Sequence, residues 1–181
     1  MSNIDYDFVE IIDGRSSGGA LWILPHCIDD NTGKEIDLPD KCGISIMESL
    51  ASEFLIEFLY YFYDPDIQTH EKLHQFEEYH FDWFEPNEYS AKDIRIMLKL
   101  ISKISDMFIN DYNNPILDCV KENFAWFLYT NKRRSELSEE EFEELLKKRV
   151  SVAVNFYDRF VKRMEVMLEL PGINKVSFCG P

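Results

Sequence analysis

Apolar side chains recur every three or four residues along much of the chain, which is the spacing of one face of a helix. The first such stretch predicts a helix over 44–63, with polar side chains on its opposite face. Its apolar face carries Ile46, Leu50, Phe54 and Phe58. The Asp64-Pro65 pair ends this helix, because the residue before a proline is pushed out of the helical region. A short second helix is predicted over 66–81.

A more sharply delimited helix is predicted to begin after Ser90. Ser90 and Asp93 form a capping box, in which side chains satisfy backbone N–H groups that the first helical turn leaves unpaired. The apolar face that follows carries Ile94, Met97, Ile101, Ile104 and Phe108. Asn114-Pro115 then breaks the chain and starts another helix. The apolar residues that line up along it are Ile116, Val120, Phe124 and Phe127.

The longest helix is predicted from Ser138 to about Leu170. Ser138 and Glu141 form its capping box, and Pro171-Gly172 ends it. A helix of this length spans about 50 Å. Its β-branched residues, where a bend is most favoured, are Val150, Val152 and Val154.

Short apolar runs bounded by turn residues predict strands near both ends of the chain. The predicted strands cover 8–12, 20–24 and 173–179. The turn-rich segment 13–19 is predicted to join the first two as a hairpin, and the polar stretch 25–43 is predicted to be a loop. We therefore predict one domain over 1–181 of the mainly α class, a helical domain with a small antiparallel sheet formed from the N- and C-terminal segments.

The composition excludes a disordered chain and shows a strong acidic bias. Of 181 residues, 45% are hydrophobic and 14% aromatic, while 34 acidic side chains against 19 basic ones give a formal charge of −15. Residues 1–88 hold 20 acidic and 4 basic side chains, whereas 89–181 hold 14 and 15. A surface this acidic is repelled by nucleic-acid phosphates and by anionic lipids, so we expect neither a nucleic-acid nor a membrane partner.

The chain opens without the basic and apolar regions of a signal peptide, and its most apolar run is too short to span a membrane. Its cysteines are scattered along the sequence, at Cys27, Cys42, Cys119 and Cys179. Scattered thiols in a domain of this size predict a reduced, cytoplasmic protein. His26 and Cys27, with Cys42 beyond them, follow no zinc-binding spacing, so we expect no metal there and no cofactor.

The densest acidic region is residues 64–88, which contain eight carboxylates and a single lysine. Aromatic residues are interleaved with them or directly follow them, at Phe76, Tyr79, Phe81, Trp83, Phe84 and Tyr89. In one interpretation the aromatics are buried in a core and the carboxylates are simply solvated. In the other, the carboxylates attract a cationic partner and the aromatics anchor it. The excess of negative charge is larger than solubility requires, which favours the second interpretation.

Residues 70–74 read His-Glu-Lys-Leu-His and fit the H-E-x-x-H pattern, in which two histidines one helical turn apart hold zinc and the glutamate activates water. With His80 six residues past His74, the run resembles the metzincin metalloproteases over eleven residues. That resemblance implies zinc ligands at His70, His74 and His80 and a general base at Glu71. Glu77 stands where the family has a glycine that lets the chain turn, so metallopeptidase activity is the alternative interpretation.

In size, charge and lopsided acidity, the chain resembles the immunity proteins of bacterial polymorphic toxin systems, such as contact-dependent growth inhibition. The resemblance implies a non-enzymatic cytoplasmic inhibitor that binds and neutralises a cognate basic toxin domain, a nuclease or a tRNase. From their charge and aromatic character, the residues expected to bind the partner are Glu77, Glu78, Tyr79, Asp82, Trp83, Phe84 and Glu85. An interaction adaptor that inhibits nothing is a further alternative.

Overall fold

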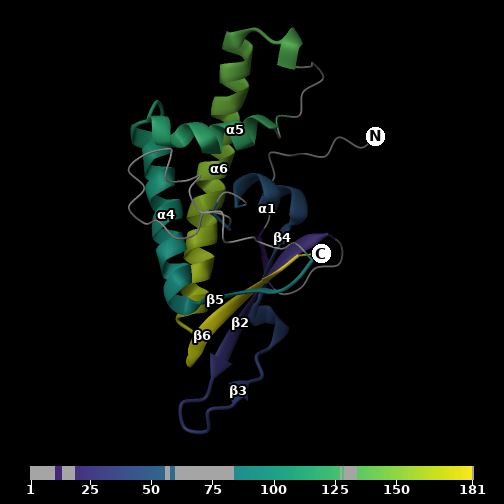
Figure 1. Ribbon diagram of the computed structural model, residues 1–181, viewed down its shortest axis with the longest axis vertical. Helices are drawn as coiled ribbons and strands as arrows, with labels where there is room; N and C mark the ends of the chain where they lie inside the picture. Colours follow the sequence, from purple (N-terminus) through teal and green to yellow (C-terminus); the bar gives the residue numbers. More distant parts are fainter. Residues whose placement is uncertain are drawn as a thin grey trace.

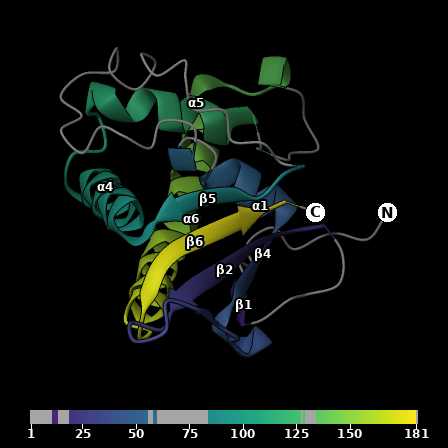
Figure 2. The same cartoon turned by 60° about the horizontal axis from the view of Figure 1, so that its bottom comes forward.

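The structure, a computed structural model, pairs an antiparallel sheet with a layer of helices (Figures 1 and 2). The residues that it describes are 11–13, 19–55, 58–59, 84–126, 128 and 134–180. The long helices α4 and α6 lie side by side against one face of the sheet, and α5 crosses near the upper part of α6 (Figure 1). The opposite face of the sheet is covered by no helix longer than a single 3-10 turn within the described ranges (Figure 2).

Six strands form the sheet in the described part of the chain. They are β1 (Ile11–Asp13), β2 (Ala20–Ile28), β3 (Glu35–Ile36), β4 (Ile44–Met47), β5 (Asn87–Ser90) and β6 (Ile173–Cys179). Their order across the sheet is β1-β4-β2-β6-β5, with β3 paired to the far end of β2, and every pairing is antiparallel. The two ends of the chain therefore meet at the centre of the sheet, where β2 pairs with β6.

The described helices are α1 (Glu48–Phe54), α4 (Ala91–Asn110), α5 (Asp118–Trp126) and α6 (Glu139–Leu168). The two long ones, α4 and α6, begin where the sequence predicts capping. Ser90 accepts a hydrogen bond from the Asp93 N–H at 3.1 Å, and Ser138 and Glu141 form a complete capping box. α6 runs without interruption through its β-branched residues and ends two residues before the predicted position. Single 3-10 turns cover Asp40–Cys42, Pro115–Leu117 and Arg134–Glu136.

The core lies between the sheet and the helices and is rich in aromatic rings. The Phe54 ring contacts Phe124 edge-on at 5.5 Å and Phe156 at 5.3 Å between centroids, which joins α1 to both α5 and α6. The predicted apolar face of α4 is buried throughout, at Ile94, Met97, Ile101, Ile104 and Phe108. The sheet contributes Leu21, Ile23, Ile44, Ile46, Val176 and Phe178 to the same core.

The fold class is mixed α and β rather than mainly α. The antiparallel sheet does form from the N- and C-terminal segments as predicted, but β5 joins it from the middle of the chain. The predicted helix over 44–63 is wrong at its start, because 44–47 form β4 and α1 begins only at Glu48. Ile44 and Ile46 alternate with polar Ser45, which is strand spacing, and four residues are too few for periodicity to reveal this.

The predicted loop over 25–43 is also wrong, because β2 continues through Pro25 to Ile28. Proline lacks the N–H group that a central strand needs, yet Pro25 lies where β2 changes partner. On that side β2 pairs with β4 up to Ile23 and with β3 from Cys27. Pro25 therefore occupies the gap between two partner strands, where a missing donor costs little.

The predicted hairpin across 13–19 does not form. β1 and β2 do not pair with each other, since both pair with β4, on its opposite edges. A local pattern cannot distinguish a hairpin from two strands separated by an inserted third strand, because the third strand comes later in the sequence.

Gly172 joins the end of α6 to β6 and packs against Ile28 of β2, and we expect its replacement to be costly. Its φ is 72°, and a Cβ atom there would lie 2.1 Å from the Ile28 carbonyl oxygen. Gly172→Ala should lower the free energy of unfolding by about 2–4 kcal/mol, combining left-handed strain with a backbone clash. Gly33 has a similar φ of 65° with no atom within 4 Å, so Gly33→Ala should cost only about 1–2 kcal/mol. Urea unfolding of both variants measures the difference, and equal losses would contradict the predicted clash.

Candidate functional site

The sheet presents two different faces, set by the alternation of side chains along β2 and β6. Ile23 pairs with Phe178, and both point into the core. Leu24 pairs with Ser177 and His26 pairs with Lys175, so these four side chains lie on the face away from α4 and α6. We call this second surface the outer face.

Three polar side chains from three strands form a connected hydrogen-bond chain on the outer face. The Oγ of Ser177 on β6 lies 2.7 Å from Nε2 of His26 on β2. Nδ1 of His26 lies 2.7 Å from Oε1 of Glu35 on β3. A neutral imidazole bonded in this way donates from Nδ1 to the carboxylate and accepts the serine hydroxyl proton at Nε2. The two bonds fix the orientation of the ring.

An ion pair between β6 and β5 lies beside this hydrogen-bond chain. Nζ of Lys175 donates to Oε2 of Glu88 on β5 at 2.8 Å, and both side chains are about half exposed. The hydrogen bond to Lys175 holds the pKa of the Glu88 carboxyl below its ordinary value, and Glu88 in turn raises the pKa of Lys175. We refer to Glu35, His26, Ser177, Lys175 and Glu88 together as the polar belt.

The hydroxyl–imidazole–carboxylate order of the polar belt is the order that activates serine nucleophiles. Ser177, however, is only 3% exposed and lies in mid-strand, between β2 and β5. A substrate carbonyl has no approach to its Oγ in this arrangement, and the backbone of Ser177 is committed to the sheet. The three residues therefore act as a brace that ties β2, β3 and β6 together.

A shallow cavity of about 390 Å³ opens beside the imidazole of the polar belt. His26 and Glu35 form one wall, and the chain after β3, including Asp37 and Leu38, forms the other. The cavity has the size of a small-molecule site, but its lining is evenly polar and apolar and contains no cluster of converging charges.

Apolar side chains cover the other half of the outer face. Trp22 pairs with Cys179, and Met47 pairs with Ala20, so Trp22, Leu24 and Met47 share this surface. Trp22 and Leu24 are half-buried, and Met47 is 52% exposed. The outer face is thus divided into the polar belt and an adjoining apolar half.

The segment before β5 lies at the apolar end of the outer face. β5 runs antiparallel to β6 with Asn87 opposite Phe178, so residues 84 and 85 precede it near Cys179. Phe84 is 89% exposed, Glu85 is exposed as well, and the Asn87 side chain donates to the Glu85 carbonyl at 2.9 Å. An aromatic ring exposed to this degree is typical of a binding surface rather than of a core.

The two halves of the chain differ in whether their carboxylates form ion pairs. On α5 and α6, ion pairs join Asp118 to Lys121, Glu143 to Lys147, Glu144 to Lys148 and Asp158 to Lys162. These pairs balance the C-terminal half, as its mixed sequence predicts. Within the described N-terminal half, Asp30, Asp37, Glu48 and Glu85 have no cation at ion-pair distance. Their negative charge is therefore uncompensated.

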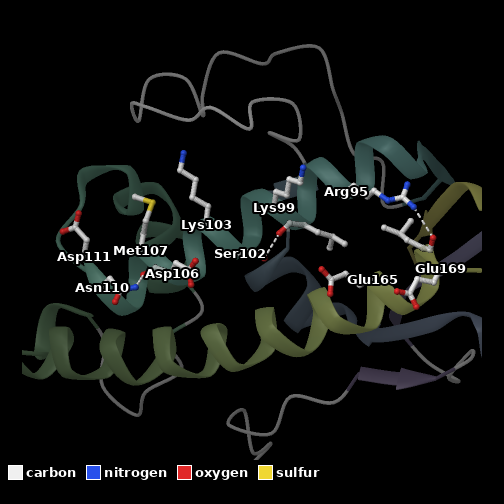
Figure 3. A pocket seen from close by; sticks show the side chains of 12 residues that line it. Arg95, Lys99, Ser102, Lys103, Asp106, Met107, Asn110, Asp111, Glu165 and Glu169 are labelled. Atoms are coloured by element: carbon white, nitrogen blue, oxygen red, sulfur yellow. Dashed lines mark hydrogen bonds between the residues drawn. The ribbon is translucent and has the colours of Figure 1, made fainter.

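A larger groove of about 920 Å³ runs between α4 and α6 (Figure 3). Arg95, Lys99 and Lys103 recur every fourth residue along α4, and Figure 3 shows Lys99 and Lys103 projecting from the same side of the helix. Glu165 and Glu169 line the groove from α6. Arg95 also donates to the Leu168 carbonyl at 3.2 Å, which caps the end of α6.

Most of the sequence-predicted site lies outside the described residues. This holds for Glu77, Glu78, Tyr79, Asp82 and Trp83, and for the metzincin-like residues His70, Glu71, His74 and His80. Of the predicted binding residues, Phe84 and Glu85 are described, and both are exposed. Among the described residues no group of three potential metal ligands comes together, and Cys27 and Cys119 are buried cysteines. None of the helices in the described ranges combines the length and apolarity that crossing a membrane requires.

Sequence reasoning missed the polar belt. Its members lie up to 151 positions apart, and only the pairing of β2 with β6 brings them together. The alternation of Leu21 and Ile23 with Trp22 and Leu24 was a usable signal for a long strand, but Pro25 concealed its continuation.

Compared with known proteins, the chain matches no family model, no curated protein and no solved structure.

Proposed function

We propose that this protein is an acidic inhibitor of the immunity type, which binds and neutralises a cationic toxin domain in the cytoplasm. The observation that carries the proposal is the exposure of Phe84 beside Glu85, at the end of the segment with eight carboxylates and one lysine. An exposed aromatic side chain surrounded by charges of one sign is typical of a residue that anchors a protein–protein interface.

The distribution of charge supports a cationic partner. Carboxylates of α5 and α6 have lysine neighbours, so their far field is weak. Residues 1–88 hold 20 acidic and 4 basic side chains, a net charge of −16, and such a field accelerates the encounter with a positively charged protein. A nuclease or tRNase domain presents a cationic surface of this kind, because it must bind phosphates.

In this proposal Glu77, Glu78, Asp82 and Glu85 occupy the phosphate-binding surface of the toxin. Tyr79, Trp83 and Phe84 exclude water around those charge pairs and so strengthen them. The protein itself carries out no chemistry: inhibition follows from covering the surface that the nucleic acid would use.

The test uses the toxin domain that this proposal predicts to be encoded beside the gene for this chain, purified as a catalytically inactive variant for binding and expressed in active form for growth assays. Co-expression of this chain should restore growth. Raising salt from about 0.05 to 0.5 M shortens the Debye length from roughly 14 to 4 Å and should slow association at least tenfold by stopped-flow fluorescence. The proposal would be refuted if co-expression of this chain did not restore growth, or if the association rate did not change with salt concentration.

A further inference from the structure

We infer that the seam between α4 and α6, on the exposed side of the helical layer, is a docking site for a basic amphipathic helix of a partner protein. By the seam we mean the surface between Ser102 and Tyr112 on the α4 side and between Lys147 and Glu165 on α6. It is separate from the acidic segment proposed above for the toxin, and the inference does not rest on that proposal.

The seam is hollow along its length and open to solvent. Two cavities follow one another between the helices, one of about 270 Å³ beside Asp106 and Glu165 and one of about 390 Å³ beside Ile109 and Asn155. All four of these residues are exposed, and Ile109 is 65% exposed. The seam is therefore a surface that the fold leaves uncovered.

Apolar side chains run along the seam. Val154 and Val161 lie seven residues apart, which places them on one side of α6, and both are half-buried. Ile109 lines the same cavity as Val154, from α4. Partner helices that bind in a groove present apolar side chains at spacings of three, four and seven residues, and such a face can pack along this strip.

The seam favours a helical partner over an extended one. The backbone groups in the middle of α4 and α6 are hydrogen-bonded within each helix, so the seam offers a partner only side chains. An extended peptide buried there would leave its own backbone N–H and C=O groups unpaired, which costs free energy. A helix satisfies its backbone internally and avoids that cost.

The uncompensated charges of the seam are negative. Its lysines, Lys147 and Lys162, each form an ion pair with a carboxylate of α6. Asp106 and Glu165 also line the seam, and their carboxylates form no ion pair with any residue in the described part of the chain. A basic helix would place lysine or arginine beside these two carboxylates, whereas an acidic helix would be repelled by them.

The cationic row of the adjoining groove is directed away from the seam. Figure 3 shows Lys99 and Lys103 projecting away from α6, while the carboxylates of Asp106 and Glu165 lie between the two helices. Arg95 is held at the far end of the groove, where it donates to a carbonyl of α6. The positive charges of α4 therefore do not cancel the negative charge of the seam.

The test measures binding of a synthetic helical peptide to the whole chain. The peptide has about 18 residues, with leucine at the spacing of one helical face, lysine at the other positions and a fluorescein label. By fluorescence anisotropy it should bind at least tenfold more tightly than the same peptide with glutamate in place of lysine. Ile109→Gln should weaken its binding at least fivefold, and so should the double variant Asp106→Asn, Glu165→Gln.

Each seam variant has a matched control. Val166→Gln replaces an apolar residue that is 62% exposed on α6 but lines neither cavity. The double variant Asp30→Asn, Glu122→Gln removes two exposed carboxylates outside the seam, so it changes the net charge as the double seam variant does. Both controls should change the affinity less than twofold.

Circular dichroism and thermal unfolding establish that each variant folds, and Ile109→Gln alone decides the matter if the double seam variant does not. The inference would be overturned if the seam variants bound the lysine peptide as wild-type protein does, or if the controls lost as much affinity as the seam variants. Equal binding of the glutamate peptide would overturn it as well. The toxin proposal is tested with another ligand and other residues, so none of these results decides it.

Discussion

Replacing Arg149 with methionine is expected to lower the free energy of unfolding by about 3–5 kcal/mol, the largest loss of stability we predict for a single substitution. Arg149 on α6 is 7% exposed and donates through Nε and Nη2 to both carboxylate oxygens of Glu53 on α1, which is 2% exposed. Removing the arginine leaves a buried carboxylate without its counter-ion, and that unpaired charge is the main cost.

The surroundings of the pair explain why the loss should be large. The Arg149 guanidinium also lies 4.9 Å from the centroid of the Phe54 ring. The last carbonyls of α1 are satisfied by neighbouring helices, since Asn123 donates to the Glu53 carbonyl at 2.7 Å and Tyr157 to the Phe54 carbonyl at 3.0 Å. The ion pair therefore holds one end of α1 at the junction of α5 and α6, and its loss disturbs three helices together.

The effect should also depend on pH in a defined direction. Burial raises the pKa of the Glu53 carboxyl, and Arg149 opposes that rise by favouring the charged form. Without Arg149 the pKa rises further, so folded protein takes up a proton that unfolded protein, with its ordinary pKa, does not. A carboxyl group whose pKa is higher in the folded protein than in the unfolded protein stabilises the fold at pH values below its unfolded pKa. That stabilisation is lost as the pH rises. The deficit of Arg149→Met should therefore shrink as pH falls from about 7 to about 5.

Urea unfolding at the two pH values measures both effects. Lys148→Met is the matched control, because the neighbouring Lys148 forms an exposed pair with Glu144 that is worth less than about 1 kcal/mol. The double variant Glu53→Met, Arg149→Met should recover most of the loss, since it leaves no buried charge behind. Similar small losses for Arg149→Met and Lys148→Met would show that the buried pair contributes no more than a surface one.

The parts of the fold that sequence predicts are those encoded by neighbouring residues. Ser138 and Glu141 specify the start of α6 within four positions, and Pro171-Gly172 specifies its end almost as locally. The strand predictions failed where a strand depends on its pairing with residues far away in the sequence. Pro25 argues against a strand in any short window, and only the change of partner from β4 to β3 makes it tolerable.

The candidate site likewise has one part that neighbouring residues predict and one part that they do not. Phe84 and Glu85 could be selected from composition, because clustered carboxylates and aromatics are visible in one stretch of sequence. The polar belt could not, since nothing near His26 indicates that Ser177 and Glu35 will lie at 2.7 Å from its two ring nitrogens. Register between distant strands decides such contacts, and one sequence does not encode register in any local pattern.

Reversing three charges in the acidic segment should weaken binding to the proposed toxin domain by about 3–6 kcal/mol. The variant is Glu77→Lys, Glu78→Lys, Asp82→Lys, in a stretch where Lys72 is the only nearby cation. Each reversal removes an attraction and introduces a repulsion. The aromatic residues Tyr79 and Trp83 are expected to exclude water there, which strengthens both effects.

The matched control reverses three carboxylates elsewhere, so that both variants change the net charge equally. Glu122, Glu144 and Asp158 are exposed on α5 and α6, and the last two already pair with Lys148 and Lys162. Reversing them to lysine should cost less than about 1 kcal/mol of binding, because their far field is already compensated. Isothermal titration calorimetry against the same inactive toxin domain compares the two variants. Equal losses would mean that only the net charge of the protein matters for binding. A larger loss in the control would instead indicate that the interface lies on the helical layer. Most of the binding energy comes from the surface that loses its water on binding, rather than from the total charge.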